Sequence, residues 1–132
     1  LVIAMAIIME GVVSLLPMPE SIRLMFEQAM QINFPGYLTL CIAAPLLEEL
    51  IFRGVVLKIF LKKYSPNIAI VLSAVVFGIA HLNPWQFIAA FAIGLVIGWI
   101  YWKTQSIWPG IFMHWANNSF GFFLAKKFER RL

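Results

Sequence analysis

The sequence predicts an all-α membrane protein: a polytopic transmembrane bundle of about four to five apolar helices, with one amphipathic helix at the membrane interface. The 132 residues are 62% hydrophobic and only 12% charged, whereas soluble domains are about 25% charged. The mean hydropathy is +0.88, and a soluble domain this small could not cover so much apolar surface. We expect a single membrane-embedded domain over residues 1–132. Because the chain begins with Leu rather than Met, we expect a fragment or core of a longer protein.

The N-terminal third contains one apolar stretch and one mixed stretch. Residues 1–16 are apolar and end at Pro17, which is consistent with the tail of a longer span. In residues 20–33, charged side chains alternate with apolar ones, a pattern typical of an amphipathic helix lying at the membrane surface. Pro35 and Gly36 are expected to break the chain before the next span.

Four further apolar stretches follow, separated by short breaks. The second stretch has about 25 residues, enough to cross a bilayer with some tilt. In the fourth stretch, Gly94 and Gly98 are four residues apart, a spacing that allows close helix contact. The stretches two to five cover Tyr37–Leu61, Asn67–Leu82, Trp85–Trp102 and Ile107–Ala125.

The basic residues flank the apolar runs and are expected to contact lipid headgroups rather than nucleic acid. Residues 58–63 and Lys103 fit one cytoplasmic side, with the third and fourth stretches as a hairpin. A fifth full span then leaves the basic cluster at 126–131 outside, against the positive-inside rule. A short or re-entrant fifth segment, or a further tail, would resolve this conflict, and the sequence leaves both open.

Three ionisable side chains lie within the second apolar stretch. Each costs about 2.5–3.5 kcal/mol near the bilayer centre, so Glu48, Glu49 and Arg53 together cost about 7–10 kcal/mol on that scale. Glu49 and Arg53 are four residues apart and can pair on one helix face. Glu48 is rotated by about 100° from Glu49, which leaves it available as a general base. The alternative is that all three form one structural ion network.

The two histidines and one asparagine lie in the later apolar stretches. His81 ends the third stretch, one turn after Phe77, and such a histidine is often structural. His114 and Asn118 are four residues apart and share a helix face, a pair that often serves only helix packing in membranes. Buried polar groups in lipid need one another as partners. We therefore expect one shared site formed with Glu48.

Three motifs carry a resemblance to a known family. Residues 48–53 read E-E-x-x-x-R, residues 77–81 read F-x-x-x-H, and residues 114–118 read H-x-x-x-N. In this order on successive apolar segments, they resemble the CPBP family of CAAX proteases and bacteriocin-processing enzymes, also called the Abi family. Its eukaryotic relative is the Ras-converting CAAX endopeptidase. The resemblance covers residues 37–125, the motif-bearing core.

The resemblance implies an intramembrane glutamate-dependent endopeptidase in a bacterial plasma membrane, cleaving a membrane-associated or lipidated protein or peptide. Glu48 would activate water, and His81 would position or polarise that water. His114 and Asn118 would stabilise the oxyanion. The supporting residues would be Glu49, Arg53 and Phe77.

The cofactor stays open between zinc and none. Two histidines and a glutamate form a recognised zinc set, and the candidate ligands are Glu48, His81 and His114. However, the chain lacks an H-E-x-x-H motif, and a Glu/His/Asn site can work without metal.

Two other functions compete with the protease. A non-catalytic membrane protein of bacteriocin immunity would need none of the catalytic side chains. A b-type haem protein would use His81 and His114 as axial ligands, although the neighbouring acidic pair argues against haem.

Overall fold

The computed structural model describes residues 4, 7–8, 11–12, 14–29 and 33–129. Within these ranges the chain is helical with short links, as the sequence predicts, and contains no strand. The elements in chain order are α2 (Glu20–Ala29), α3 (Phe34–Tyr37), the π-helix η1 (Leu38–Ala43), α4 (Ala44–Ile51), the π-helix η2 (Phe52–Leu57), α5 (Lys58–Leu61), α6 (Pro66–Ala80), α7 (Pro84–Thr104) and α8 (Trp108–Glu129).

The N-terminal predictions are met only in part. Half of the first apolar stretch, 1–16, lies outside the described residues, and residues 4, 7–8, 11–12 and 14 are helical. The mixed segment forms the helix α2, and its exposed Glu20 and Arg23 form an ion pair. The Arg23 guanidinium holds the pKa of the Glu20 carboxyl below its ordinary value. Residues 30–32 lie outside the described residues.

One long helical run extends from Phe34 to Leu61 through α3, η1, α4, η2 and α5. The predicted break at Pro35 and Gly36 is wrong, because both residues lie in the first turn of this run. Proline is tolerated there, since the first N–H groups of a helix have no partner within the helix. Asn33 caps the turn, and its side-chain oxygen accepts a hydrogen bond of 2.8 Å from the Gly36 N–H.

Each of the two π-helices offers a backbone carbonyl to a neighbouring helix. The Leu40 carbonyl in η1 accepts a hydrogen bond of 2.9 Å from Asn118 Nδ2 of α8. The Phe52 carbonyl in η2 accepts one of 3.3 Å from Ser73 Oγ of α6. π-helices are rare and occur frequently at functional sites. Here they flank α4, the segment that carries Glu48.

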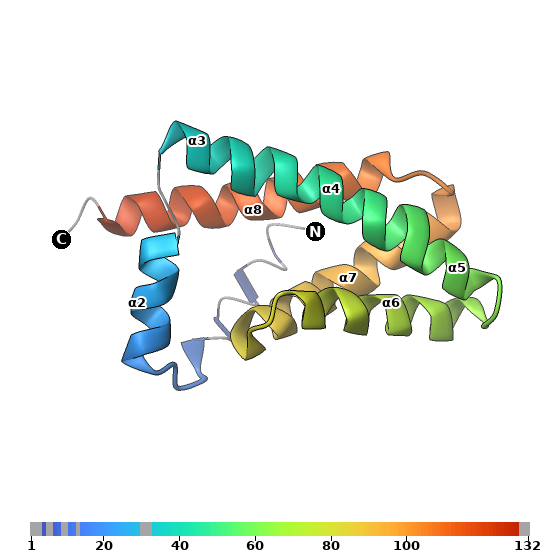
Figure 1. Cartoon of the computed structure of the whole chain (residues 1–132), viewed down its shortest axis with the longest axis horizontal. Helices are drawn as coiled ribbons and strands as arrows, with labels where there is room; N and C mark the ends of the chain where they lie inside the picture. The colour runs from blue at the N-terminus through green and yellow to red at the C-terminus, as the bar shows by residue number, and fades with distance from the viewer. Residues whose placement is uncertain (1–3, 5–6, 9–10, 13, 30–32, 130–132) are drawn as a thin grey trace.

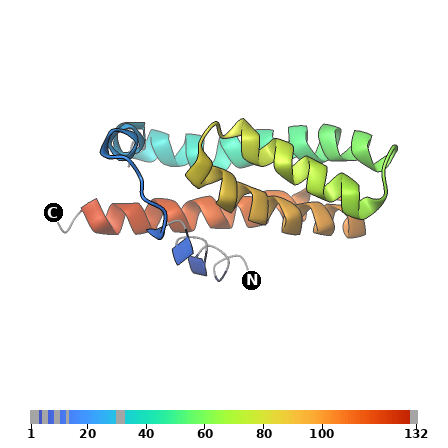
Figure 2. The same cartoon turned by 90° about the horizontal axis from the view of Figure 1, so that it is seen from below.

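Four long helical runs pack as a bundle. Figure 1 shows the run from α3 to α5 antiparallel to α8, and α6 antiparallel to α7. In Figure 2 the α3–α5 run and α8 lie at two separate levels, and α6 and α7 are inclined relative to both. Contacts join α6 to α7, α7 to α8, α8 to η1 and α4, and α6 to α5 and η2. The helix α2 runs across one end of the bundle (Figure 1).

The predicted close helix contact at Gly94 and Gly98 is present between α7 and α6. A Cβ atom on Gly94 would lie 3.2 Å from Ala74 Cβ, and one on Gly98 would lie 3.1 Å from Ile70 Cγ2. Both distances are shorter than ordinary van der Waals contact, so a side chain at either position would crowd α6. The small-xxx-small prediction is confirmed.

Lys126 and Lys127 lie in the last turn of α8, whereas residues 58–63 and Lys103 lie at the other end of the bundle, where the long run and α7 end. Buried Leu57, Ala69, Ile70 and Tyr101 form a core cluster there, which joins the end of the long run to the start of α6 and the end of α7. The predicted hairpin of the third and fourth stretches is therefore confirmed. The fifth stretch forms one continuous helix, α8, without the break of a re-entrant segment.

Among the described helices, α7 is long and apolar enough to cross a membrane. In its apolar window 33% of the residues are buried inside the bundle, and most of the others are partly exposed. The helix α6 is also apolar but has only 15 residues.

Candidate active site

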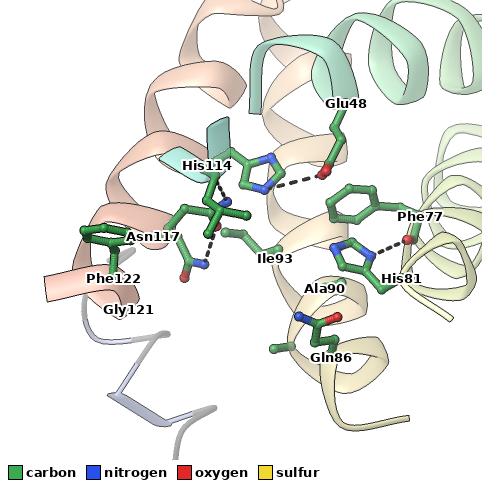
Figure 3. A pocket seen from close by; sticks show the side chains of 13 residues that line it. Glu48, Phe77, His81, Gln86, Ala90, Ile93, His114, Asn117, Gly121 and Phe122 are labelled. Carbon is green, nitrogen blue, oxygen red and sulfur yellow. Dashed lines mark hydrogen bonds and ion pairs between the residues drawn. The ribbon is translucent and has the colours of Figure 1, made fainter. Parts of the chain in front are cut away.

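A pocket of about 290 Å³ opens between α4, η1, the end of α6, α7 and α8. Glu48, His81, His114 and Asn118 all line it, although they come from three separate motifs. Figure 3 shows Glu48 and His81 facing the pocket from either side of Phe77, with His114 beside Glu48. The sequence predicted this shared site, and the structure brings its four residues together.

The Glu49–Arg53 pair lies beneath the pocket and is almost completely buried. Arg53 Nη1 donates a hydrogen bond of 2.8 Å to Glu49 Oε1, and the exposed fractions of the two side chains are 1% and 0%. Arg53 Nη2 donates to the Gly94 carbonyl at 3.2 Å. The guanidinium lies 4.7 Å from the centre of the Phe77 ring, in cation–π range. The pairing predicted from the four-residue spacing is thus present.

His114 contacts both glutamates, which the sequence did not predict. Its Nδ1 lies 3.1 Å from Glu49 Oε1, and its Nε2 lies 3.6 Å from Glu48 Oε2. An ionised carboxylate only accepts hydrogen bonds. His114 Nδ1 therefore carries a hydrogen atom and donates a hydrogen bond to Glu49 Oε1. The Nε2 atom faces Glu48. Glu49 therefore has a second partner besides Arg53.

Glu48 differs from its neighbour in exposure and in partners. Its side chain is 31% exposed and lines the pocket. Its Oε2 atom, like Oε2 of Glu49, is buried and makes no hydrogen bond in the described structure, but only Glu48 lines the pocket. A buried acceptor without a partner is rare and calls for a water or substrate group. Because the Arg53 hydrogen bonds go to Glu49 and Gly94, the two glutamates have separate tasks.

His81 is held by its own helix. It is the C-terminal cap of α6, and its Nδ1 lies 2.9 Å from the Phe77 carbonyl. A carbonyl accepts only, so Nδ1 carries the proton and Nε2 keeps a lone pair. The Phe77 ring stands edge-on to both histidines, with centroid distances of 5.0 Å to His81 and 5.6 Å to His114. Leu82 follows with a φ of 53°, which turns the chain sharply toward α7.

Asn118 is held by hydrogen bonds at both ends of its amide. Its Nδ2 donates to the Leu40 carbonyl, and its Oδ1 accepts a bond of 3.3 Å from Asn117 Nδ2. Asn117 also lines the pocket. Sequence reasoning missed Asn117, because its polar side chain is adjacent to the H-x-x-x-N motif but not part of it.

The candidate metal ligands do not fit a zinc ion. In the described part of the chain, no group of three His, Cys, Asp or Glu side chains lies close enough to hold a metal. The Nδ1 hydrogen bonds of His114 to Glu49 and of His81 to the Phe77 carbonyl orient the two rings and leave both Nε2 atoms without these partners.

Comparisons with known proteins agree with this fold and site on the class of protein. The chain is 34% identical over 79 residues to a Bacillus subtilis (strain 168) protein named "Putative membrane peptidase YdiL". The match covers 60% of this chain but only 32% of the relative, so the chain spans about a third of the curated relative. No solved structure matches it.

The helical fold and this similarity relate the chain to a class of proteins named as membrane peptidases. Within it, the chain belongs to the Rce1-like family: the family model "Type II CAAX prenyl endopeptidase Rce1-like" matches residues 30–120. This confirms the resemblance seen in the three motifs and points to a membrane protein. The bacteriocin-immunity and haem alternatives gain no support from either comparison.

Proposed function

We propose that this chain is the catalytic core of an intramembrane, glutamate-dependent endopeptidase. The observation that carries the proposal is the convergence of Glu48, His81, His114 and Asn118 on one pocket. The α3–α5 run, α6, α7 and α8 would be the transmembrane helices of a polytopic bundle, with α2 at the interface. The membrane would be a bacterial plasma membrane.

Glu48 is the base that activates water. Its Oε2 is a buried acceptor without a hydrogen-bond partner, and a water there would lose its proton to the carboxylate as its oxygen attacks a peptide carbonyl. The gap of 3.6 Å to His114 Nε2 is too long for a direct hydrogen bond. It suits two groups that meet through a water or a substrate atom.

His81 positions this water through Nε2. The Phe77 carbonyl holds its Nδ1 proton, so Nε2 is left as an acceptor for one water hydrogen. Two acceptors, Glu48 Oε2 and His81 Nε2, would orient the lone pair of the water oxygen toward the scissile carbonyl.

His114 and Asn118 stabilise the oxyanion. The hydrogen on His114 Nδ1 is used in the bond to Glu49. The nitrogen that faces the pocket is Nε2, and it donates a hydrogen bond to the oxyanion when it also carries a hydrogen. The charges of Glu48, Glu49, Arg53 and His114 then sum to zero, which a low-dielectric interior favours. Asn118 Nδ2 has a second hydrogen besides the one given to Leu40. One such donor in other hydrolases contributes about 2.7–4 kcal/mol.

The substrate is a membrane-associated or lipidated protein or peptide. Besides the polar groups, Leu40, Ala90, Ile93 and Phe122 form an apolar wall of the pocket. An apolar wall beside a polar reaction centre favours a segment with apolar side chains. The partly exposed apolar surface of α7 supports substrate delivery from the lipid phase.

The test compares cleaved peptides in cells that express the wild type, Glu48→Ala or Glu20→Ala. Glu20→Ala is the matched control, because it removes an exposed carboxylate far from the pocket. New peptide termini that need the protein should disappear with Glu48→Ala and persist with Glu20→Ala. Membrane insertion and helix content, measured by fractionation and circular dichroism, should be equal in all three. Undiminished cleavage by Glu48→Ala would contradict the proposal.

A further inference from the structure

The backbone carbonyl of Leu40 has no hydrogen-bond donor within its own helix, because the residue in the donor position is a proline. In an α-helix it would accept from the N–H of Ala44, four residues later. In η1 the Ala44 N–H instead donates to the Thr39 carbonyl, five residues earlier. In that π register the next donor, the one for Leu40, would be the N–H of residue 45. That residue is Pro45, which has no N–H.

Asn118 supplies the missing donor. Its Nδ2 lies 2.9 Å from the Leu40 carbonyl oxygen, and a carbonyl can only accept. The amide of Asn118 is therefore oriented with its nitrogen toward η1 and its oxygen toward Asn117. Because only the nitrogen end of the amide can donate to this carbonyl, the hydrogen bond exists in one of the two orientations of the Asn118 amide and not in the other.

We infer that Pro45 is a positioning residue for Asn118. It keeps the Leu40 carbonyl without a helical donor, and that carbonyl fixes which end of the Asn118 amide lies at η1 and which lies at Asn117. The orientation follows from the hydrogen bonds alone. Its catalytic consequence rests on the proposed function, in which Asn118 contributes to oxyanion stabilisation.

Pro45→Ala is the direct change. Alanine fits a helix and restores an N–H in line with the Leu40 carbonyl, which then competes with Asn118 for the same oxygen. Pro66→Ala is the matched control, because Pro66 lies in the first turn of α6, where the N–H has no partner within the helix. Both variants exchange one proline for alanine in a helix of the same bundle.

The first measurement is independent of activity. In the full chain labelled with ¹⁵N in detergent micelles, the side-chain amide signals of Asn118 are followed by NMR, with assignment from Asn118→Asp. Pro45→Ala should shift the signals of the two hydrogens on Asn118 Nδ2 and broaden them or bring them together. The reason is that the hydrogen bond to the Leu40 carbonyl, which makes the two hydrogens different, is weakened. Pro66→Ala should leave them in place. Unchanged Asn118 signals in a folded Pro45→Ala variant would overturn the inference.

The second measurement separates positioning from general stability. The probe is the peptide whose cleavage depends on Glu48, identified by the comparison of cleaved peptides. Pro45→Ala should lower kcat about tenfold or more, since small misplacements of a catalytic group cost up to about 100-fold, with little change in KM. In an Asn118→Ala background, Pro45→Ala should cause no further loss.

The outcomes of the two measurements are distinct. Equal losses of kcat with and without Asn118 contradict the inference, because Pro45 would then act through some other group. If the wild type cleaves no peptide, the proposed function fails. The NMR result on Asn118 still decides whether Pro45 positions it.

Discussion

The carboxylate of Glu49 lies 3.1 Å from Nδ1 of His114, which is 65 residues further along the chain. The same Oε1 atom accepts from Arg53 Nη1 at 2.8 Å. Glu49 is thus more than the ion-pair partner of Arg53. It determines which nitrogen of His114 carries a fixed proton and which one faces Glu48, as orienting carboxylates do for the histidines of other sites.

Glu49→Gln should therefore change the protonation pattern of His114. A glutamine amide can donate to Nδ1, which moves the ring proton to Nε2 and removes the negative charge beside the ring. ¹⁵N NMR of the two histidines measures this directly, because protonated and unprotonated ring nitrogens have well-separated shifts. His81 is the internal control, since the Phe77 carbonyl sets its tautomer and Glu49 does not.

The double variant Glu49→Gln/Arg53→Met separates positioning from the ion pair. Removing one partner of a buried pair costs about 3–5 kcal/mol, whereas replacing both is often neutral. The double variant should therefore recover much of the thermal stability that Glu49→Gln loses. It should remain inactive, because His114 still lacks its orienting carboxylate. Recovery of both stability and cleavage would show that Glu49 only balances the charge of Arg53.

Arg53→Lys should not be a conservative change. The planar guanidinium reaches Glu49 and the Gly94 carbonyl with two different nitrogens, and it stacks over Phe77. A lysine ammonium is a single point donor and cannot make this fork. We expect a stability loss of about 1.5–3 kcal/mol, the range for a hydrogen bond to a charged group. Chemical denaturation in detergent measures this loss. A change below about 0.5 kcal/mol, the size of a neutral surface substitution, would show that the two hydrogen bonds of Arg53 contribute little.

At Gly110 the helix α8 leaves no room for a side chain beside Glu49. A Cβ atom there would lie 2.7 Å from Ile97 Cγ2 and 3.0 Å from Glu49 Oε2. Gly110→Ala should therefore destabilise the bundle by about 1–3 kcal/mol, as overpacking does, and lower cleavage by moving the carboxylate. Gly54→Ala is the control, because a Cβ there meets nothing within 4 Å. Gly54→Ala should be neutral or should stabilise the bundle by up to about 1 kcal/mol. Equal changes in Tm for Gly110→Ala and Gly54→Ala would show that α8 is not tightly packed at Gly110.

Local patterns in the sequence predict the helices and the residues that line the pocket. Hydrophobic runs predict the helices, and the four-residue spacing of Glu49 and Arg53 predicts their pairing, because both depend only on helix geometry. Motif order predicts that His81 and His114 share a pocket. The break at Pro35 is mispredicted because proline at a first turn and proline in a loop look alike in a sequence.

The hydrogen bonds between different helices could not be predicted from the sequence. The bond from His114 to Glu49 and the bond from Asn118 to Leu40 depend on how α8 lies against the long run. No local pattern encodes that packing. The π-helices are equally hidden, although Pro45 is a partial signal because it cannot donate to an earlier carbonyl.

Cleavage should survive complete removal of metal. A zinc site needs three protein ligands that reach one point, and the described residues contain no such group. The Nδ1 atoms of both histidines are occupied by the hydrogen bonds that orient the rings, which leaves Glu48 and two Nε2 atoms for the reaction itself. The measurement is cleavage of the Glu48-dependent peptide after dialysis against EDTA and 1,10-phenanthroline, with the metal content of the protein determined by mass spectrometry. The wild-type protein should keep its kcat even when its metal content is well below one ion per chain. Zinc bound at one per chain, and lost with activity in both His81→Ala and His114→Ala, would instead show that the pocket rearranges around a metal.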